Sequence, residues 1–204
     1  MELLVMKLKV KPELAYQMTF LYAVLTIPSL LLWKSMYPSS LHSVPDPQCF
    51  QDRAILAPTN DIVEKINDHV MSKMLGEVVE YLSSDSICKT ERDMADNEDV
   101  FSPEFLNTIK CFGLPNHVIR LKVGCLVMLL RNIDQARGLC NGTRIVVTKL
   151  GKQVIEASPI SGKEKGQNVL ICSMIMSPSN FTKFPIRFQR RQFPLSVCFA
   201  MTIK

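Results

Sequence analysis

The stretch that decides the fold of the second half of the chain is "LKVGCLVMLLRNIDQARGLCNGTRIVV" (residues 121–147). Its apolar runs are short, and the Asn-Gly pair at 141–142 between them is a strong signal for a tight turn. Two further runs of the same kind follow, with Gly151 and Gly162 in the turns between them. Turns therefore recur about every 10 residues, a spacing that predicts a small antiparallel barrel or sandwich over 121–180.

A different pattern precedes this region, in "RAILAPTNDIVEKINDHVMSKMLG" (53–76). The apolar residues Ala54–Ala57 predict a short strand that Pro58 breaks, and Thr59 or Asn60 then caps a helix. Apolar side chains recur in this helix every four residues until a glycine ends it. Such a strand-loop-helix unit is typical of α/β proteins.

Three other segments carry local signals. The polar stretch "SSDSICKTERDMADNEDVFSPEF" (83–105) has an acidic excess and no periodicity, so it predicts a solvated surface excursion. Near its end, Ser102 and Pro103 suit the cap and the first position of a short helix. The apolar run Phe193–Ile203 predicts one further strand.

The charge of the chain is divided unevenly along its length. Residues 1–104 hold 9 Lys and Arg against 16 Asp and Glu, a difference of −7, whereas residues 105–204 hold 15 against 3, a difference of +12. The alternatives are a solvated basic face that binds nothing and a surface for an anionic partner. We favour nucleic acid, because Lys and Arg supply most of the non-specific affinity for phosphates.

The sequence excludes several kinds of chemistry. Its seven cysteines include no C-x-x-C pair and its three histidines lack ligand spacing, which argues against a disulfide framework and a zinc site. It contains neither the P-loop motif G-x-x-x-x-G-K-[ST] nor G-x-G-x-x-G. We therefore predict no catalytic residue, no metal site and no cofactor held by this chain alone.

The amino-terminal region leaves three alternatives open. Residues 18–33 contain no charge and follow three lysines, which is compatible with a membrane anchor, a buried segment or an unstructured leader. Pro28 interrupts the run, and a bilayer needs about 20 apolar residues, so membrane insertion is the least favoured of the three.

Three ordered blocks, at residues 53–67, 121–147 and 190–203, resemble the carboxyl-terminal half of PIF-type, RecD-like superfamily-one DNA helicases, in particular their plant and Helitron-associated branch. The resemblance covers about residues 36–204. It implies an α/β fold: a partial RecA-like motor domain of the P-loop NTPase type, into which a small antiparallel SH3-like β subdomain is inserted.

The resemblance also implies a division of the chain. We expect a leader of uncertain structure at 1–35, part of the second RecA-like helicase domain at 36–120, the SH3-like subdomain of the 2B type at 121–180, and a truncated return strand of the RecA-like domain at 181–204.

Contacts with single-stranded DNA are expected at three places. In the family, the loop that follows the first strand meets the DNA backbone, which corresponds to Pro58, Thr59 and Asn60. Donors at a helix amino terminus suit phosphate oxygens, although Thr59 and Asn60 as mere helix caps remain the alternative. Thr202 corresponds to a residue near the DNA. An electrostatic track on the inserted subdomain would consist of Arg131, Arg137, Arg144 and Lys149.

The sequence also departs from the family. After Ala200–Ile203 the family's motif continues Asn-Lys-Ser-Gln-Gly, whereas this chain has Lys204 alone, and it carries no Walker motifs. Cys172, Ser173 and Met174 stand where relatives carry Pro-Arg-Ile, which removes one potential phosphate-binding arginine.

These observations lead to one preferred function and two alternatives. We expect a fragment of an ATP-dependent 5′-to-3′ DNA helicase that binds single-stranded DNA but does not hydrolyse ATP alone. ATP and Mg²⁺ belong to the full-length family, and a separate chain would carry the first motor domain. The expected location is the nucleus, with mitochondria as the alternative. The other functions are a non-catalytic nucleic-acid-binding module and an unproductive truncated gene product.

Overall fold

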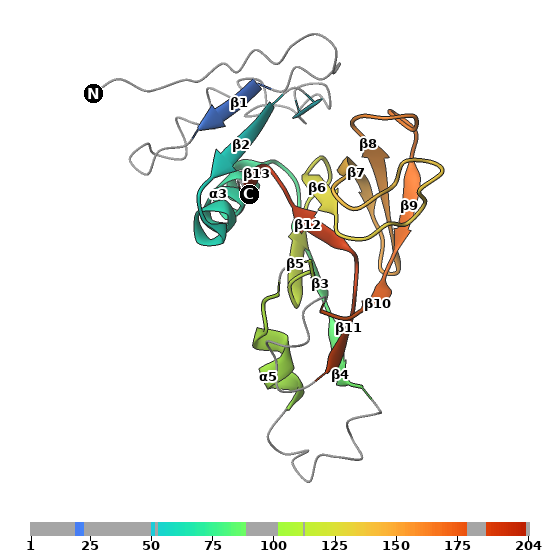
Figure 1. Cartoon of the computed structure of the whole chain (residues 1–204). Coiled ribbons are helices and arrows are strands. Elements are labelled where there is room, and N and C mark those ends of the chain that lie inside the picture. The colour runs from blue at the N-terminus through green and yellow to red at the C-terminus, as the bar shows by residue number, and fades with distance from the viewer. Residues whose placement is uncertain are drawn as a thin grey trace, which may run out of the picture.

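The computed structural model describes part of the chain. For Thr19–Tyr22 it describes only the backbone. Four small sheets and the helices α3 and α5 make up this part (Figure 1). The described residues are 19–22, 50–51, 53–88, 102–111, 113–178 and 187–202.

A parallel sheet lies at one end of the molecule (Figure 1). Its strands are β1 (Thr19–Tyr22), β2 (Arg53–Ala57) and β13 (Ala200–Thr202), and β2 lies between the other two and runs parallel to both. Helix α3 (Asn60–Lys73) follows β2 and contacts both β2 and β13. The predicted strand-loop-helix unit is therefore confirmed.

The ends of α3 follow from local chemistry. The side chain of Thr59 caps the helix, since its Oγ1 accepts a hydrogen bond from the Ile62 amide at 3.4 Å. Just beyond the helix, Gly76 has a φ of +98°, a conformation that L side chains rarely adopt. The buried face of α3 consists of Ile66, Asn67, Val70 and Met71.

The largest sheet is antiparallel and has five strands. In spatial order these are β12 (Leu195–Val197), β6 (Leu126–Leu129), β7 (Arg144–Leu150), β8 (Val154–Pro159) and β9 (Val169–Cys172). Strands β6 to β9 are consecutive in the chain and each pairs with the next. The antiparallel structure predicted from the recurring turns is therefore confirmed.

Two smaller antiparallel sheets extend away from the parallel sheet (Figure 1). One pairs β3 (Val79–Leu82) with β5 (Val118–Leu121), and the other has the order β10-β11-β4. Its strands are β10 (Met174–Met176), β11 (Phe188–Gln192) and β4 (Ser84–Ile87). The short helix α5 (Pro103–Thr108) packs against β4, and Ser102 caps it as predicted, accepting a bond from the Phe105 amide at 3.3 Å.

Two expectations are wrong. The run Phe193–Ile203 is not one strand, because the chain leaves the antiparallel sheet after β12 and enters the parallel sheet as β13. The side chain of Asn67 holds this change of sheet: its Nδ2 donates to the Val197 carbonyl at 3.0 Å, and its Oδ1 accepts from the Ala200 amide at 2.9 Å.

The stretch 83–105 is not simply a surface excursion. Its first part forms strand β4, and the Asp85 side chain in that strand is completely buried. The partner that permits this burial is Arg190, which lies 105 residues further along the chain.

The described part of the uncharged amino-terminal segment is strand β1, and the rest of that segment lies outside the described residues. Within the described residues, no helix is both long enough and apolar enough to span a membrane.

Candidate nucleic-acid interface

The residues predicted to contact DNA at the start of the helix converge with Thr202. Strands β2 and β13 run parallel, and Thr202 is paired with Ala57, the residue before Pro58. Pro58, Thr59 and Asn60 are exposed, and Thr202 is half-buried. Segments far apart in the sequence thus meet at the carboxyl edge of the parallel sheet.

This edge offers donors to an anion. The first amides of a helix lack partners within the helix, and their dipoles favour negative charge. Here the Ile62 amide is already bonded to the Thr59 side chain, and the Val63 amide to the Thr59 carbonyl at 3.1 Å. The cap is therefore observed, whereas the DNA contacts of Pro58, Thr59, Asn60 and Thr202 stay predictions.

The four basic residues of the predicted track differ in their access to solvent. Lys149 has a side chain that is 73% exposed, 3.7 Å from Glu156, and Arg137 forms a 3.0 Å ion pair with Glu164. Arg131 is half-buried, and its guanidinium donates to the carbonyl of Ser177 at 3.1 Å.

Arg144 does not fit the surface position that the track requires. It is only 8% exposed, and its guanidinium interacts with Cys198. Burial raises the pKa of the Cys198 thiol to about 11, against the opposing charge and hydrogen bond of Arg144. A phosphate would reach Arg144 only if this packing opened, because the cation lies beneath the sheet surface.

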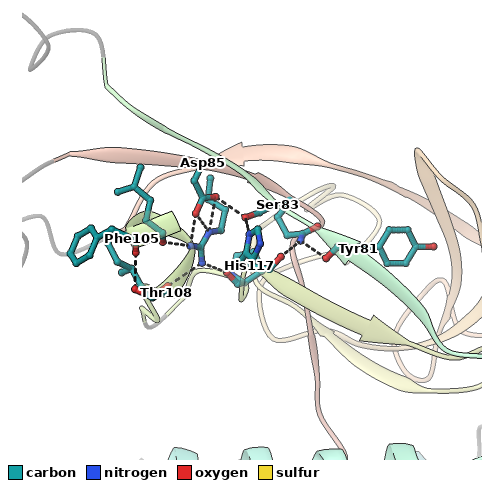
Figure 2. A network of polar contacts seen from close by, with 11 residues as sticks. Tyr81, Ser83, Asp85, Phe105, Thr108 and His117 are labelled. Carbon is teal, nitrogen blue, oxygen red and sulfur yellow. Dashed lines mark hydrogen bonds and ion pairs between the residues drawn. The ribbon is translucent and has the colours of Figure 1, made fainter. Parts of the chain in front are cut away.

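A network of polar side chains lies around β4 and β11 (Figure 2). No pattern in the sequence predicted it. Arg190 and Asp85 form an ion pair at 2.6 Å, and both side chains are completely buried. Ser83 donates to Asp85 at 2.7 Å and lies 2.8 Å from Nδ1 of His117, as Figure 2 shows.

Arg190 also holds the chain around α5. Its Nη1 donates to the carbonyls of Ile109 at 3.1 Å and Pro115 at 3.0 Å, and its Nη2 donates to that of Leu106 at 2.8 Å. The charge and the donors of the guanidinium are thus satisfied internally, which indicates a structural role. In β11 the buried positions alternate and hold Phe188, Arg190 and Gln192. Two of these three residues are polar, so the sequence shows no apolar alternation that would have revealed the network.

A cleft of about 720 Å³ lies between α3 and strand β5, and no sequence pattern indicated it. The chain that leads from α5 into β5 lines one wall, and strand β12 also lines the cleft. At one side the buried Lys122 amine donates to the Met74 carbonyl at 2.7 Å. The cleft is therefore lined by both the helix of the parallel region and the antiparallel region.

The described residues hold no cluster of metal ligands, and one of their thiols is buried and unreactive. No group of three or more His, Cys, Asp or Glu side chains in this part of the chain could hold a metal ion. Burial raises the pKa of the Cys125 thiol to about 12, so this thiol is protonated at neutral pH and is a poor nucleophile.

The family described as "DNA helicase Pif1, 2B domain" matches residues 104–150. The chain resembles part of a Pif1-type DNA helicase. The matched segment includes α5, β5, β6 and β7, and therefore holds Arg131, Arg144 and Lys149 but neither the 58–60 loop nor Thr202. The expected resemblance to a Pif1-type helicase is confirmed, whereas the plant and Helitron-associated branch stays a prediction.

Solved Pif1 structures share the fold. The Pif1 helicase from Candida albicans is 20% identical, with a TM-score of 0.51, and the match covers 72% of this chain and 35% of that one. Bacteroides sp Pif1 in complex with ADP-AlF4 is also 20% identical, with a TM-score of 0.50, over 85% of this chain and 35% of that one. The chain thus spans about a third of the length of these helicases. No curated protein matches it.

Proposed function

We propose that this chain is the single-stranded-DNA-binding part of a Pif1-type, ATP-dependent 5′-to-3′ DNA helicase. In this proposal β2, α3 and β13 belong to a partial RecA-like motor domain, and the antiparallel strands β6 to β9 form an inserted SH3-like subdomain. One observation carries it: the segment similar to a Pif1 2B domain lies between α3 and β13, two elements that contact each other. The chain thus leaves the parallel region and returns to it after an insertion.

Two surfaces support DNA binding. Pro58, Thr59, Asn60 and Thr202 gather at one sheet edge, where the amino terminus of a 14-residue helix suits a phosphate. Lys149 is an exposed cation on the inserted antiparallel sheet. The excess of 12 positive charges in residues 105–204 favours an anionic partner for this half of the chain.

ATP hydrolysis is proposed to need a second chain. Phosphoryl transfer requires the lysine of a P-loop together with Mg²⁺ and an arginine. The sequence contains no P-loop. This chain would therefore bind DNA by itself and contribute to ATP hydrolysis only beside a chain that carries the first motor domain. ATP and Mg²⁺ would be held by that assembly.

Two assays on the purified chain test this function. Fluorescence anisotropy with a labelled oligodeoxythymidine should show binding in the micromolar range or weaker that declines steeply with salt. Lys149→Glu should weaken it further, because an exposed cation becomes an anion. Flat isotherms at low salt would exclude DNA binding, and DNA-stimulated ATP hydrolysis by the chain alone would contradict the dependence on a second chain.

A non-catalytic nucleic-acid-binding module is the second candidate, and the charge excess of the second half favours it equally. The two functions differ in their response to a first motor domain supplied in trans from a Pif1-type helicase. Recovery of DNA-dependent ATP hydrolysis would support the helicase part, whereas unchanged binding without hydrolysis would support the module.

A further inference from the structure

The cleft between α3 and β5 has walls of opposite charge. Glu64 and Asp68 line it on the helix, and Lys110 and Arg120 line it on the opposite wall. The two acidic residues are four apart, so they lie on one face of α3, and Asn60 precedes them on the same face by one further turn. The cleft therefore begins one helical turn away from the predicted DNA contact at Asn60.

Carboxylates hold two of the three Lys and Arg side chains that line the cleft, and the third, Lys122, is bonded to the Met74 carbonyl. The Nζ of Lys110 is 2.7 Å from Oε2 of Glu64, and this pair connects the two walls. The Nε of Arg120 is 2.6 Å from Oε1 of Glu80. This hydrogen bond and the charge of Glu80 raise the pKa of Arg120, and the charge of Asp68 raises it further, so Asp68 also acts on this guanidinium.

These ion pairs are open to exchange. The side chains of Lys110 and Arg120 are 65% and 64% exposed. Exposed pairs of this kind contribute little to stability, because water screens the charges and both long side chains lose freedom. A phosphate can therefore replace a carboxylate on either cation at low cost, in contrast to the buried pair of Arg190 and Asp85.

The remaining lining suits a nucleotide. The amides of Asn107 and Asn116 offer donors and acceptors, and Val118 offers an apolar contact. The hydroxyls of Ser72 and Thr108 already donate to backbone carbonyls, so they offer acceptors only. A volume of about 720 Å³ lies within the range of sites for small organic ligands, so one nucleotide of a strand fits.

We propose that Lys110 and Arg120 form an additional phosphate-binding site for single-stranded DNA, which Glu64 and Glu80 mask by occupying its cations. This inference rests on the proposed function, since it concerns the same ligand. DNA that enters the cleft takes over the two cations, and the carboxylates are released to solvent. Glu64 of α3 and Glu80 of β3 thereby lower the affinity of the free protein for DNA.

The test removes the masking charges and leaves the cations in place. Glu64→Gln combined with Glu80→Gln should raise the affinity for oligodeoxythymidine at low salt about three- to tenfold, because it releases both Lys110 and Arg120. The plot of log K against log salt should become steeper by up to about 1.4, since each newly engaged phosphate on a single strand contributes about 0.7.

A matched control separates this effect from a general change of charge. Glu77→Gln combined with Glu104→Gln removes two exposed carboxylates that do not line the cleft. This pair should leave the slope unchanged. Adding Lys110→Gln and Arg120→Gln to the cleft variant should abolish its gain, with circular dichroism to confirm that each variant folds.

The same titrations distinguish failure of the additional site from failure of the proposed function. Equal gains and equal slopes for the cleft variant and the control would overturn the additional site and leave the proposed function intact, because the original chain would still bind DNA. Absence of binding by the original chain and by every variant would overturn both.

Discussion

The parallel and the antiparallel regions of this molecule are built from different kinds of contact. Strands β6, β7, β8 and β9 pair with their neighbours in the chain, so each pairing closes a short loop. Strand β2 instead pairs with β13, from the opposite end of the described chain. The parallel sheet therefore depends on the return of the chain after the insertion, whereas the antiparallel sheet largely assembles from local hairpins.

Two polar side chains hold long-range contacts, Arg190 within the antiparallel part and Asn67 at the step between the two regions. Arg190 binds the chain around α5 to β11 and β4, and Asn67 holds the step from β12 to β13. Strands that pair with distant segments have few local contacts, so specific polar side chains, here called anchors, hold them in place. Substitutions at these anchors should affect the two regions unequally.

The largest expected effect follows Arg190→Met. The substitution keeps most of the volume but leaves the buried Asp85 carboxylate without its cation, which should cost about 3–5 kcal/mol of unfolding free energy. Urea unfolding followed by circular dichroism measures this. Arg191→Met, at the exposed neighbouring position, should change stability by less than about 0.5 kcal/mol. Equal losses in the two variants would show that Arg190 is not an anchor.

An intermediate and local effect is expected for Asn67→Ala. It removes two hydrogen bonds and leaves the Val197 carbonyl and the Ala200 amide without that partner, at a cost of about 2–4 kcal/mol. Hydrogen exchange should accelerate in β13 and much less in β7. Lys65→Ala, at an exposed position of the same helix, is the control. Uniform acceleration in both strands would contradict the division into two regions.

The smallest change in stability is expected for two variants at the start of α3, which together distinguish helix capping from DNA contact. Thr59→Ala removes the cap and should cost about 1 kcal/mol of stability. Asn60→Ala should change stability by less than about 0.5 kcal/mol but weaken oligonucleotide binding, because an exposed amide is lost. Thermal unfolding and anisotropy measure the two quantities, and unaltered binding by the Asn60 variant would remove this residue from the interface.

Features with local causes were predicted correctly. Thr59 and Ser102 cap their helices because each oxygen bonds an amide three residues ahead. Gly142 has a φ of +90°, as the Asn-Gly pair predicted, because glycine adopts positive φ without steric cost. The cues for these features lie within a few residues, so the sequence displays them directly.

Features that depend on contacts between distant residues were not predicted correctly. Asp85 looked like a solvated acidic residue because its partner Arg190 is 105 residues away. Arg144 looked like a surface cation, but the packing of β7 with the chain at Cys198 buries it. The cleft and its opposed charges arise where α3 faces β5, and no spacing in the sequence indicates that contact.

Local patterns in the sequence indicated the strand-loop-helix unit, the helix caps and turns, the uneven charge and the resemblance to a helicase, because these depend on residue type and short spacing. Only the tertiary structure decided that the terminal apolar run is divided between two sheets, that Arg190 is buried with Asp85, and that Lys110 faces Glu64 across a cleft. The physical reason is that burial and charge pairing depend on which distant segments meet.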